Sequence, residues 1–284
     1  MIGKPRQRVA ELKRAGTAGS PAVPDDDGAD TTIPPAVQLT DVSFDYGNGV
    51  TTLQNIDLSV RPGEVVVLIG PSGCGKSTLL DLVAGVSAPT TGGLLCDGVP
   101  VRGLNKSVTY MTQRDTLLPW RTALDNAALP LEIRGVRKAE RHRRAREALA
   151  LTGLSDAEKR RPHQLSGGMR SRLALARVLL SDARIVLMDE PFAALDALRR
   201  VRLQQLLLEI WRGSQQTLVY VTHDLNEAIA LGDRIVLMGS HPGRILLERQ
   251  VDIPHPRNVA RVRTMPEAEE LYAELWSVLE SQLR

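Results

Sequence analysis

A short glycine-rich segment carries the strongest chemical signal in this sequence. Residues 70–78 read Gly-Pro-Ser-Gly-Cys-Gly-Lys-Ser-Thr, which has the P-loop spacing of glycine, four residues, glycine, lysine and serine. Small residues let backbone N–H groups wrap a phosphate, and the following helix N-terminus adds its dipole. A turn without a ligand is the alternative, but the segment follows an apolar run and precedes a helical pattern, which favours phosphate binding. We predict a nucleotide site made of Gly70, Pro71, Ser72, Gly73, Cys74, Gly75, Lys76, Ser77 and Thr78.

Two residues of this segment have side chains suited to the chemistry of a nucleotide. Lys76 can reach the outer phosphates, and the Ser77 hydroxyl can ligate Mg²⁺. Cys74 lies inside the loop, where we expect a small residue that fills space rather than an oxidation target.

A pair of carboxylates follows another apolar run, at residues 185–188. An acid at the end of a buried strand beside a P-loop is placed to bind Mg²⁺, directly or through water, and Asp189 has that position. Glu190 can accept a proton from an attacking water, as a general base does. Alone, the pair equally suits a strand end that caps a helix near Pro191. In the company of the P-loop, we predict a catalytic role.

Polar residues also follow two further apolar runs. Gln113 comes after residues 108–111, and His223 comes after residues 218–222. Ligands of open α/β sheets bind at the carboxyl ends of the strands. We therefore expect Gly70, Gln113, Asp189 and His223 to meet at one edge of a sheet. Taken singly, a loop glutamine or a core histidine would be the ordinary interpretation of either residue.

A second helix N-terminus is predicted after Leu165. Ser166 is a good N-cap candidate, and Gly167 and Gly168 leave the backbone open to a close ligand. This arrangement suits a second anion site, although taken by itself it would be interpreted as a simple helix cap. One nucleotide in one P-loop does not need such a site. Either the chain binds two anions, or the site completes a pocket in another copy.

The elements that would position these residues alternate along the chain. Continuous apolar runs at 65–69, 108–111, 185–188 and 218–221 indicate buried strands, and helical patterns lie between them. This order predicts an α/β fold with a mostly parallel sheet. Strand-like alternation also covers 37–44, with a slip at Thr40 and Asp41, and 56–60. Helical patterns cover 77–84, 170–180, 198–210 and 266–283.

Composition narrows the class of protein. The chain has 284 residues, 43% of them apolar and 24% charged, as in an ordinary globular protein. Two cysteines exclude a disulfide framework and fit a reducing compartment. We see no apolar run of transmembrane length and no secretory signal at residues 1–14. A net charge of +3 and 3% aromatic residues do not call for nucleic acid.

Together, these motifs resemble those of the ATP-binding subunits of ABC transporters, from about Val37 to the C-terminus. The resemblance implies that residues 70–78 form the Walker A motif and residues 185–189 Walker B, with Glu190 as catalytic base. It implies that Gln113 contacts Mg²⁺ and water, that His223 contacts the γ-phosphate, and that Tyr46 stacks on adenine. ATP and Mg²⁺ are the implied cofactors, and residues 194–196 the D-loop. The implied metal ligands are Ser77, Gln113 and Asp189.

The resemblance also implies an architecture. It is a P-loop NTPase core with a mostly parallel sheet, an N-terminal antiparallel β subdomain and a helical subdomain that carries the signature motif. On this chain we expect a flexible tail at 1–36, an ABC ATPase domain at 37–252 with its helical subdomain at about 114–182, and a helical extension at 253–284.

The finer similarity is to importers of the nitrate, sulfonate and taurine type, through residues 117–121, 163–169, 191–198 and 242–245. The broader resemblance to ABC ATP-binding subunits implies a head-to-tail homodimer in which the signature of one copy faces the P-loop of the other. It also implies an integral membrane permease, an indirect link to a substrate-binding protein, no nucleic acid, and a peripheral place on the cytoplasmic face of the membrane. Met169 stands where glutamine is commonest in the broad family, and Ala194 where serine is commonest.

Two other functions remain as alternatives. A soluble ABC-type ATPase that acts on nucleic acid or ribosomes usually has two ATPase halves or long insertions, whereas this chain has one copy of each motif. A P-loop kinase would leave the signature segment without a role. The basic cluster at 137–146 could face acidic lipid or nucleic acid, but a solvated helix face with a core side at Ala145, Ala148 and Leu149 is the simpler interpretation. Residues 105–108 only begin like a guanine-reading motif, so we expect ATP rather than GTP.

Overall fold

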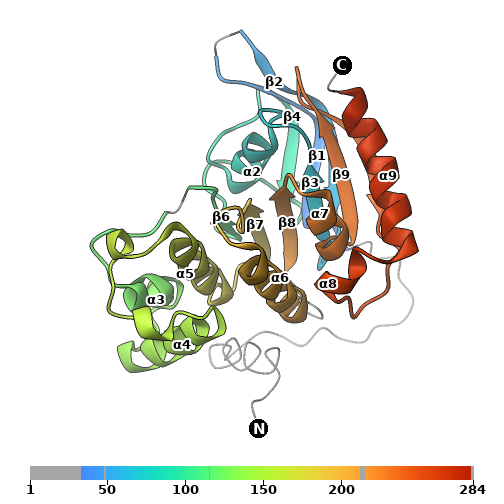
Figure 1. The fold of residues 1–284 in the computed structure, drawn as a ribbon. Coiled ribbons are helices and arrows are strands. Elements are labelled where there is room, and N and C mark those ends of the chain that lie inside the picture. Colours follow the sequence, from blue (N-terminus) through green and yellow to red (C-terminus); the bar gives the residue numbers. More distant parts are fainter. Residues whose placement is uncertain (1–32, 48, 115, 212–214, 283–284) are drawn as a thin grey trace, which may run out of the picture. The chain divides into compact units, whose positions relative to one another are not determined.

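The structure of the chain is a computed structural model, and it describes residues 33–47, 49–114, 116–211 and 215–282 (Figure 1). The tail predicted at residues 1–36 therefore lies almost wholly outside the described residues. The described chain forms two compact units. We name residues 35–116 with 183–282 the sheet unit, and residues 117–182 the helical unit.

A six-stranded sheet organises the sheet unit, in the order β10-β9-β3-β8-β7-β6 (Figure 1). The neighbours from β9 to β6 are parallel, and β10 pairs with β9 in the antiparallel sense. This arrangement confirms the predicted α/β fold with a mostly parallel sheet. The strands are β3 (Val65–Ile69), β6 (Val108–Met111), β7 (Ile185–Asp189), β8 (Thr217–Thr222), β9 (Arg234–Gly239) and β10 (Arg244–Gln250).

The central strands of the six-stranded sheet are buried on both faces, and their sequences reflect this burial. Every residue of β3, β7 and β8 is buried, so each strand is a nearly continuous apolar run rather than an alternating one. Helix α2 (Lys76–Ala84) packs on β6, β7 and β8, and helix α7 (Leu225–Leu231) packs on β3 and β8. Asp189 is the buried charged residue of these strands, and it ends β7 at the edge where the P-loop begins.

A second sheet is antiparallel throughout, in the order β2-β1-β4-β5. Its strands are β1 (Val37–Asp45), β2 (Thr51–Val60), β4 (Thr91–Cys96) and β5 (Val99–Pro100). The slip in the alternation of β1 is a bulge: pairing moves from Leu39 opposite Leu58 to Val42 opposite Ile56. Asp41 takes a φ of 49° there, so Leu39 and Val42 both reach the core. The antiparallel β subdomain implied by the resemblance is thereby confirmed.

The antiparallel sheet and the parallel sheet share one hydrophobic core. Leu79, Leu80 and Val83 of α2 lie in it with residues of both sheets. Both cysteines, Cys74 and Cys96, are buried in this core and free. The P-loop is thus anchored on the core by its own cysteine, which fills space as expected.

Four strands were not predicted from the sequence. β9 is a buried apolar run like its neighbours, but no motif follows it to draw attention to it. β10 has only intermediate or exposed residues, and β4 opens with a threonine and two glycines. β5 is only two residues long.

The chain after β10 packs back onto the sheet unit. Helix α8 (Val259–Val262) contacts α6 (Ala197–Trp211) and α7, and helix α9 (Pro266–Ser281) contacts α7 and β9. The pattern at 266–283 predicted α9, and Leu283 lies outside the described residues. Arg257 is 5% exposed, and its guanidinium donates to the carbonyl oxygens of four residues, which ties this segment to the end of α7. The four acceptors are Ile229, Gly232, Val251 and Ile253.

The helical unit consists of three mutually packed α-helices and two short 3₁₀ turns. Its elements are α3 (Ala123–Ile133), α4 (Lys138–Leu151), η1 (Ser155–Ala157), η2 (Pro162–Gln164) and α5 (Gly167–Leu179). Helix α4 presents Ala145, Ala148 and Leu149 to the interior, as its pattern predicted. The helical unit therefore has an apolar centre of its own.

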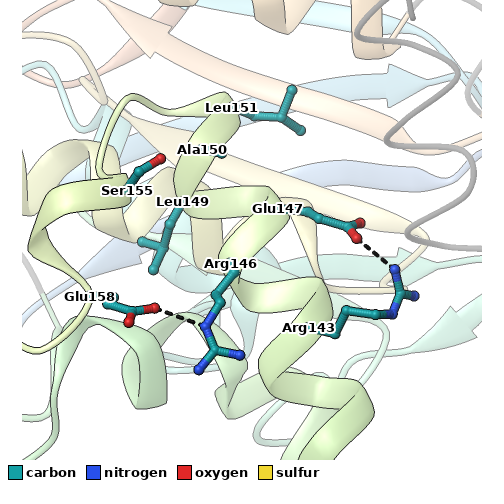
Figure 2. A pocket seen from close by; sticks show the side chains of 8 residues that line it. All are labelled: Arg143, Arg146, Glu147, Leu149, Ala150, Leu151, Ser155 and Glu158. Atoms are coloured by element: carbon teal, nitrogen blue, oxygen red, sulfur yellow. Dashed lines mark hydrogen bonds and ion pairs between the residues drawn. The ribbon is translucent and has the colours of Figure 1, made fainter. Parts of the chain in front are cut away.

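The basic cluster on α4 is only partly solvated. Arg143 pairs with Glu147, and Arg146 pairs with Glu158 (Figure 2). Arg143 also pairs with Glu140, so three acids offset these two arginines. Arg144 is a correction to the predicted solvated face, because its side chain is fully buried and has no hydrogen-bond partner among the described residues. Burial lowers the pKa of Arg144. Of the basic residues at 137–146, Arg141, Arg143 and Arg146 therefore have acidic partners.

Candidate functional site

The P-loop joins the end of β3 to the start of α2. Gly75 is the N-cap of α2 and has a φ of 92°, in the left-handed region that favours glycine. A Cβ there would lie 2.5 Å from Leu53 Cδ2, and a Cβ at Gly70 would lie 2.4 Å from the carbonyl oxygen of Met238. No described side chain caps α2. Its first N–H groups are therefore available to an anion.

Lys76 places its ammonium group inside this loop. The residue is 7% exposed, and Nζ donates to the carbonyl oxygens of Gly70 and Pro71, both at 2.8 Å. The Sγ of Cys74 lies 3.6 Å from the same nitrogen. None of these three contact atoms carries a charge, so a phosphate would add a neutralising partner to the buried cation.

Asp189 meets the P-loop from the end of β7. The residue is 4% exposed, and its carboxylate accepts a hydrogen bond from the Ser77 hydroxyl. Burial raises the pKa of Asp189, and the bond from Ser77 and the charge of Lys76 act against that rise. A hydroxyl and a carboxylate side by side are hard oxygen donors, which suit Mg²⁺. Among the described residues, this site included, no group of three His, Cys, Asp or Glu side chains is placed to hold a metal.

Glu190 lies between two other strand ends. Its backbone has a φ of 46°, which a glutamate rarely adopts, and its N–H donates to the carbonyl oxygen of Val221 at 3.0 Å. Its Oε2 accepts from Nε2 of Gln113 at 3.2 Å, and its Oε1 lies 3.4 Å from Nδ1 of His223. The ends of β6, β7 and β8 thus bring together the three side chains that the sequence places after these strands.

Tyr46 lies next to the first turn of α2, where it contacts Thr78. Its ring is 60% exposed, its hydroxyl lies 3.0 Å from Oγ1 of Thr78, and it meets Phe44 edge to face at 4.8 Å. An exposed aromatic ring that Thr78 and Phe44 hold in place offers a stacking surface for a nucleobase.

The signature segment begins α5 in the helical unit. Ser166 is its N-cap, as predicted, and the Ser166 hydroxyl accepts from the N–H of Met169 at 3.3 Å. Arg170 donates to the carbonyl oxygen of Leu165 at 2.8 Å, which fixes the entry to the helix. The two glycine-bearing helix starts, α2 and α5, therefore belong to different units of the chain.

Comparison with known proteins agrees with these motifs. Residues 53–193 match the ABC transporter family. An ABC transporter ATP-binding protein of Methanocaldococcus jannaschii is 46% identical over 220 residues, which are 78% of this chain and 82% of that one. The taurine import ATP-binding protein TauB of Pseudomonas putida is 44% identical over 217 residues, which are 76% and 83% of the two chains. This chain belongs to the ABC transporter family.

The fold agrees with solved structures of ABC ATPases. A cassette solved as a dimer in a post-hydrolysis state, bound to ADP and phosphate, is 32% identical, with a TM-score of 0.70 over 77% of this chain and 100% of that one.

TauB of Burkholderia pseudomallei, at 40% identity, matches 84% of this chain and 94% of its own. The chain is accordingly an ABC transporter ATPase, which hydrolyses ATP to drive transport. No helix in its described parts is both long and apolar enough to span a bilayer.

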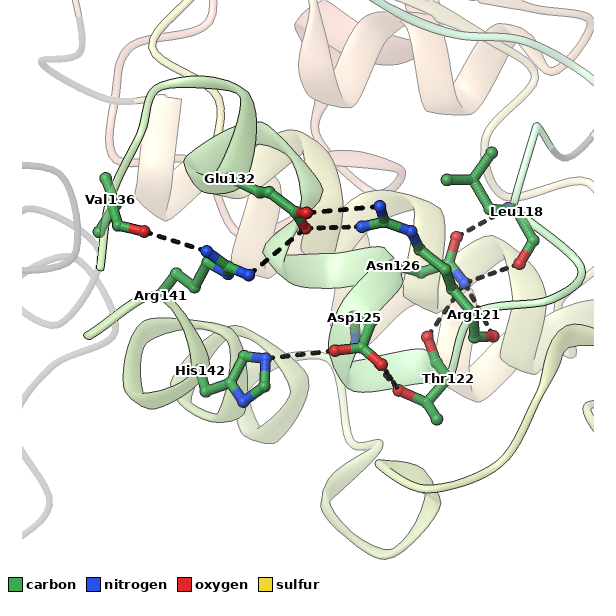
Figure 3. A network of polar contacts seen from close by, with 9 residues as sticks. All are labelled: Leu118, Arg121, Thr122, Asp125, Asn126, Glu132, Val136, Arg141 and His142. Carbon is green, nitrogen blue, oxygen red and sulfur yellow. Dashed lines mark hydrogen bonds and ion pairs between the residues drawn. The ribbon is translucent and has the colours of Figure 1, made fainter. Parts of the chain in front are cut away.

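The loop that opens the helical unit of this ABC ATPase is clamped by a buried amide (Figure 3). Asn126 is fully buried; its Oδ1 accepts from the N–H of Leu118 at 2.8 Å, and its Nδ2 donates to the carbonyl oxygens of Leu118, Arg121 and Thr122. The loop so held presents Trp120, which is 68% exposed. A large exposed aromatic on a rigid loop is a good anchor for a protein partner.

Charged pairs brace the same loop against α3 and α4. Arg121 pairs with Glu132 at 2.6 Å, and Arg141 approaches the same carboxylate at 3.8 Å (Figure 3). His142 on α4 lies 3.2 Å from Asp125 on α3. The sequence reasoning used residues 117–121 for the resemblance but missed Asn126. A polar residue on the inner side of an apolar helix is the signal that would have found it.

Proposed function

We propose that this ABC ATPase is the energy-supplying subunit of an importer for a small anion of the taurine, sulfonate or nitrate class. The similarity to taurine import ATP-binding proteins, over 76% and 84% of this chain, is the observation that carries the proposal. The subunit lies at the cytoplasmic face of the membrane and acts through a separate permease, whose binding protein delivers the cargo.

The nucleotide binds at the P-loop. The N–H groups at the start of α2 and the ammonium of Lys76 receive the phosphates, and the exposed ring of Tyr46 stacks on adenine. The side-chain ligands of Mg²⁺ are Ser77, Asp189 and Gln113. When bound, Mg²⁺ neutralises charge on the phosphates as the terminal group is transferred. The bare helix end and the neighbouring hydroxyl and carboxylate support this assignment.

Glu190 is the general base of hydrolysis. Its carboxylate takes a proton from the attacking water, while the water oxygen bonds to the γ-phosphorus and the bond to the leaving ADP oxygen breaks. Gln113 and His223 flank this carboxylate at 3.2 and 3.4 Å, so they orient it, and His223 also contacts the γ-phosphate. The left-handed backbone of Glu190 supports the role, because such conformations are retained where function requires them.

Two copies complete the site. The signature residues Ser166, Gly167 and Gly168 of one copy cover the nucleotide held by the P-loop of the other, in a head-to-tail homodimer. Two helix N-termini that suit anions, on two separate units, support this arrangement. Solved cassettes with 32% identity that are dimeric support it further.

The clamped loop at 118–122 is the part of the helical unit that meets the permease. It follows Gln113 closely in the chain, so a change in the contact between Gln113 and Glu190 can reach it through a few residues. The exposed Trp120 and the buried Asn126 that fixes the loop support a docking role. No role for nucleic acid is proposed, since the arginines of α4 are largely paired with acids.

The hydrolytic step is tested by Glu190→Gln. The amide keeps the shape of the side chain but cannot take a proton, so we expect kcat to fall by about 10²- to 10⁴-fold while ATP affinity is retained. Phosphate release and nucleotide binding on the purified chain measure both quantities. Glu270→Gln, at an exposed acid of α9, is the matched control with unchanged kcat. Normal hydrolysis by Glu190→Gln would remove the proposed base.

The transport assignment is tested in membranes. The tagged chain, bound to ATP, is recovered from detergent-solubilised membranes of the native cell, and its partners are identified by mass spectrometry. We expect a permease with several spans, and its reconstitution in vesicles to give ATP-dependent uptake of taurine, a sulfonate or nitrate. Recovery of ribosomal or DNA-associated proteins alone, with hydrolysis stimulated by nucleic acid, would overturn the importer proposal.

A further inference from the structure

A buried glutamate lies next to the proposed site. Glu227 on α7 is 6% exposed, and its Oε1 accepts from the Tyr220 hydroxyl at 2.6 Å and from Nε2 of Gln204 at 2.8 Å. Its Oε2 accepts a short hydrogen bond from the Thr222 hydroxyl. None of these three donors carries a charge, because burial raises the pKa of Tyr220 and keeps its phenol neutral. Burying a carboxylate among neutral donors costs free energy, so the fold keeps Glu227 in this place despite a loss of stability.

Two of the donors to Glu227, Tyr220 and Thr222, lie on β8, which ends just before His223. Thr222 directly precedes the histidine, and its hydroxyl oxygen also accepts from the N–H of Asp224 at 3.1 Å. Asp224 in turn caps α7 by accepting from the N–H groups of Asn226 and Glu227. These hydrogen bonds form a closed ring of residues from Thr222 to Glu227, and the backbone of His223 is part of that ring.

The histidine itself has little else to fix it. Its side chain is 64% exposed, and its contact with Glu190 is 3.4 Å long. A small cavity lies between Glu190 and Glu227. Thr222, His223 and Arg200 also line it. Packing alone does not hold an exposed imidazole in one direction, so its direction depends on the backbone from which it projects.

We infer that Glu227 is a positioning residue for His223, because its carboxylate fixes the backbone that aims the imidazole at Glu190. The inference rests on the proposed function, in which His223 orients the base and contacts the γ-phosphate.

Gln204 extends the same cluster to α6. This helix follows residues 194–196, the proposed D-loop, and Arg200 on its second turn donates to the carbonyl oxygen of Leu195 at 3.2 Å. Glu227 thus contacts both the strand that ends at His223 and the helix that follows the D-loop. A carboxylate is the side chain that can accept all these donors at once, since it presents two acceptor oxygens and no donor.

The test is a double-mutant cycle with Glu227→Gln and His223→Ala. The amide of Glu227→Gln has one acceptor oxygen instead of two, so either the Thr222 hydroxyl or the pair Tyr220 and Gln204 loses the oxygen to which it donates, and the ring around His223 is weakened. We expect kcat to fall by about 10- to 100-fold, the effect of a misplaced catalytic group, with KM for ATP unchanged. In the His223→Ala background, Glu227→Gln should cause no further loss, because it acts through the histidine.

Glu64→Gln is the matched control. Glu64 is also a buried glutamate of the sheet unit, and it bonds to Arg234 beyond the opposite end of β3 from the P-loop. This variant should lower Tm and leave kcat unchanged. Tyr220→Phe removes one donor to Glu227 and keeps the others, so it should lower kcat less than Glu227→Gln does, and it provides the test if Glu227→Gln fails to fold.

The outcomes separate the inference from the proposed function. If His223→Ala hydrolyses ATP normally, the role of the histidine in the proposed function is wrong. If His223→Ala is impaired but Glu227→Gln or Tyr220→Phe keeps full kcat, the positioning role is wrong. If the losses from Glu227→Gln and His223→Ala multiply in the double variant, Glu227 acts by a route independent of the histidine, which also overturns the inference.

Discussion

The starts of α2 and α5 both follow glycine-bearing loops, yet they satisfy their N–H groups in different ways. Helix α2 begins at a left-handed glycine, Gly75, with no cap from any described side chain, and the ammonium of Lys76 stands beside it. Helix α5 begins at Ser166, whose hydroxyl already accepts from the N–H of Met169. The first helix end leaves its N–H groups available to an anion, whereas the second already satisfies one of them with a side-chain cap.

Helix α3 shows what an end without an anion site looks like. Its N-cap Thr122 accepts from the N–H of Asp125 at 3.1 Å, and the Asp125 carboxylate accepts from the Thr122 hydroxyl at 2.6 Å. An acid in the first turn already complements the helix dipole and would repel a phosphate. Neither α2 nor α5 has an acid in its first turn. The absence of that acid separates the helix ends proposed to bind phosphate from the one that supports itself.

The largest expected effect comes from the bare end of α2. Lys76→Ala removes a buried cation that a phosphate would neutralise, and a charge-assisted contact contributes up to about 3 kcal/mol, or roughly 100-fold in affinity. Titration with a fluorescent ATP analogue measures the loss. Lys106→Ala, on the loop before β6, is the control and should bind normally. Unchanged affinity in Lys76→Ala would contradict the assignment of α2 as the phosphate site.

A second prediction concerns Gly75, the N-cap of α2, which has no side chain to cap the helix. Gly75→Ala forces a Cβ to within 2.5 Å of Leu53 at a φ of 92°, and we expect a loss of about 2 kcal/mol in the free energy of unfolding. Gly73→Ala is the matched control, because Gly73 has a φ of 80° but no described atom within 4 Å of its added Cβ. Urea denaturation of both variants separates backbone strain from crowding. Equal losses would show that contact with Leu53 contributes nothing.

The sequence predicted these elements where a local signal and a buried strand coincide. β3, β6, β7 and β8 are continuous apolar runs, and each is followed by a residue with evident chemistry, so both pattern and motif pointed to the same edge. β9 has the same apolar run without a motif behind it and was missed. The slip at Thr40 and Asp41 was visible in the alternation, since a bulge shifts the phase of a strand.

The supporting residues of the site were not predictable in the same way. Asn126 clamps a loop that begins eight residues earlier, and Glu227 bonds to Gln204, which is 23 positions away. The local pattern can mark a buried polar residue such as Asn126 on an apolar helix, but its partners depend on how the elements pack. Arg257 gives the same lesson, because its acceptors are backbone carbonyls from both the end of α7 and the segment after β10. Spacing reveals residues that meet a ligand more readily than residues that hold those residues in place.

The third prediction tests the capped end of α5. Ser166→Ala removes the cap and should lower the free energy of unfolding by about 1 kcal/mol. In the proposed dimer, the same variant should bind ATP normally as a single chain but dimerise weakly and hydrolyse slowly. Analytical ultracentrifugation with the slowly hydrolysed Glu190→Gln background measures the dimer. Thr122→Ala, the cap of α3, is the control, with a similar loss of stability and normal dimerisation. Normal dimerisation by Ser166→Ala would make α5 a simple helix cap.

The smallest effect is expected at the end of α3 that supports itself. Burial alone would raise the pKa of Asp125, but the hydrogen bond from Thr122 and the nearby His142 outweigh it and lower the pKa below 3.8. A lowered carboxyl pKa stabilises the fold above the unfolded value, and that contribution is lost as pH falls through the folded value. Because Asp125 is partly exposed, we expect well under 1 kcal/mol. Urea unfolding of the wild type and Asp125→Asn, from about pH 6 to about pH 3, should show a stability difference that shrinks toward the acid end. A difference that stays constant across this range would mean that the Asp125 charge contributes nothing, and that the Thr122 hydroxyl alone caps α3.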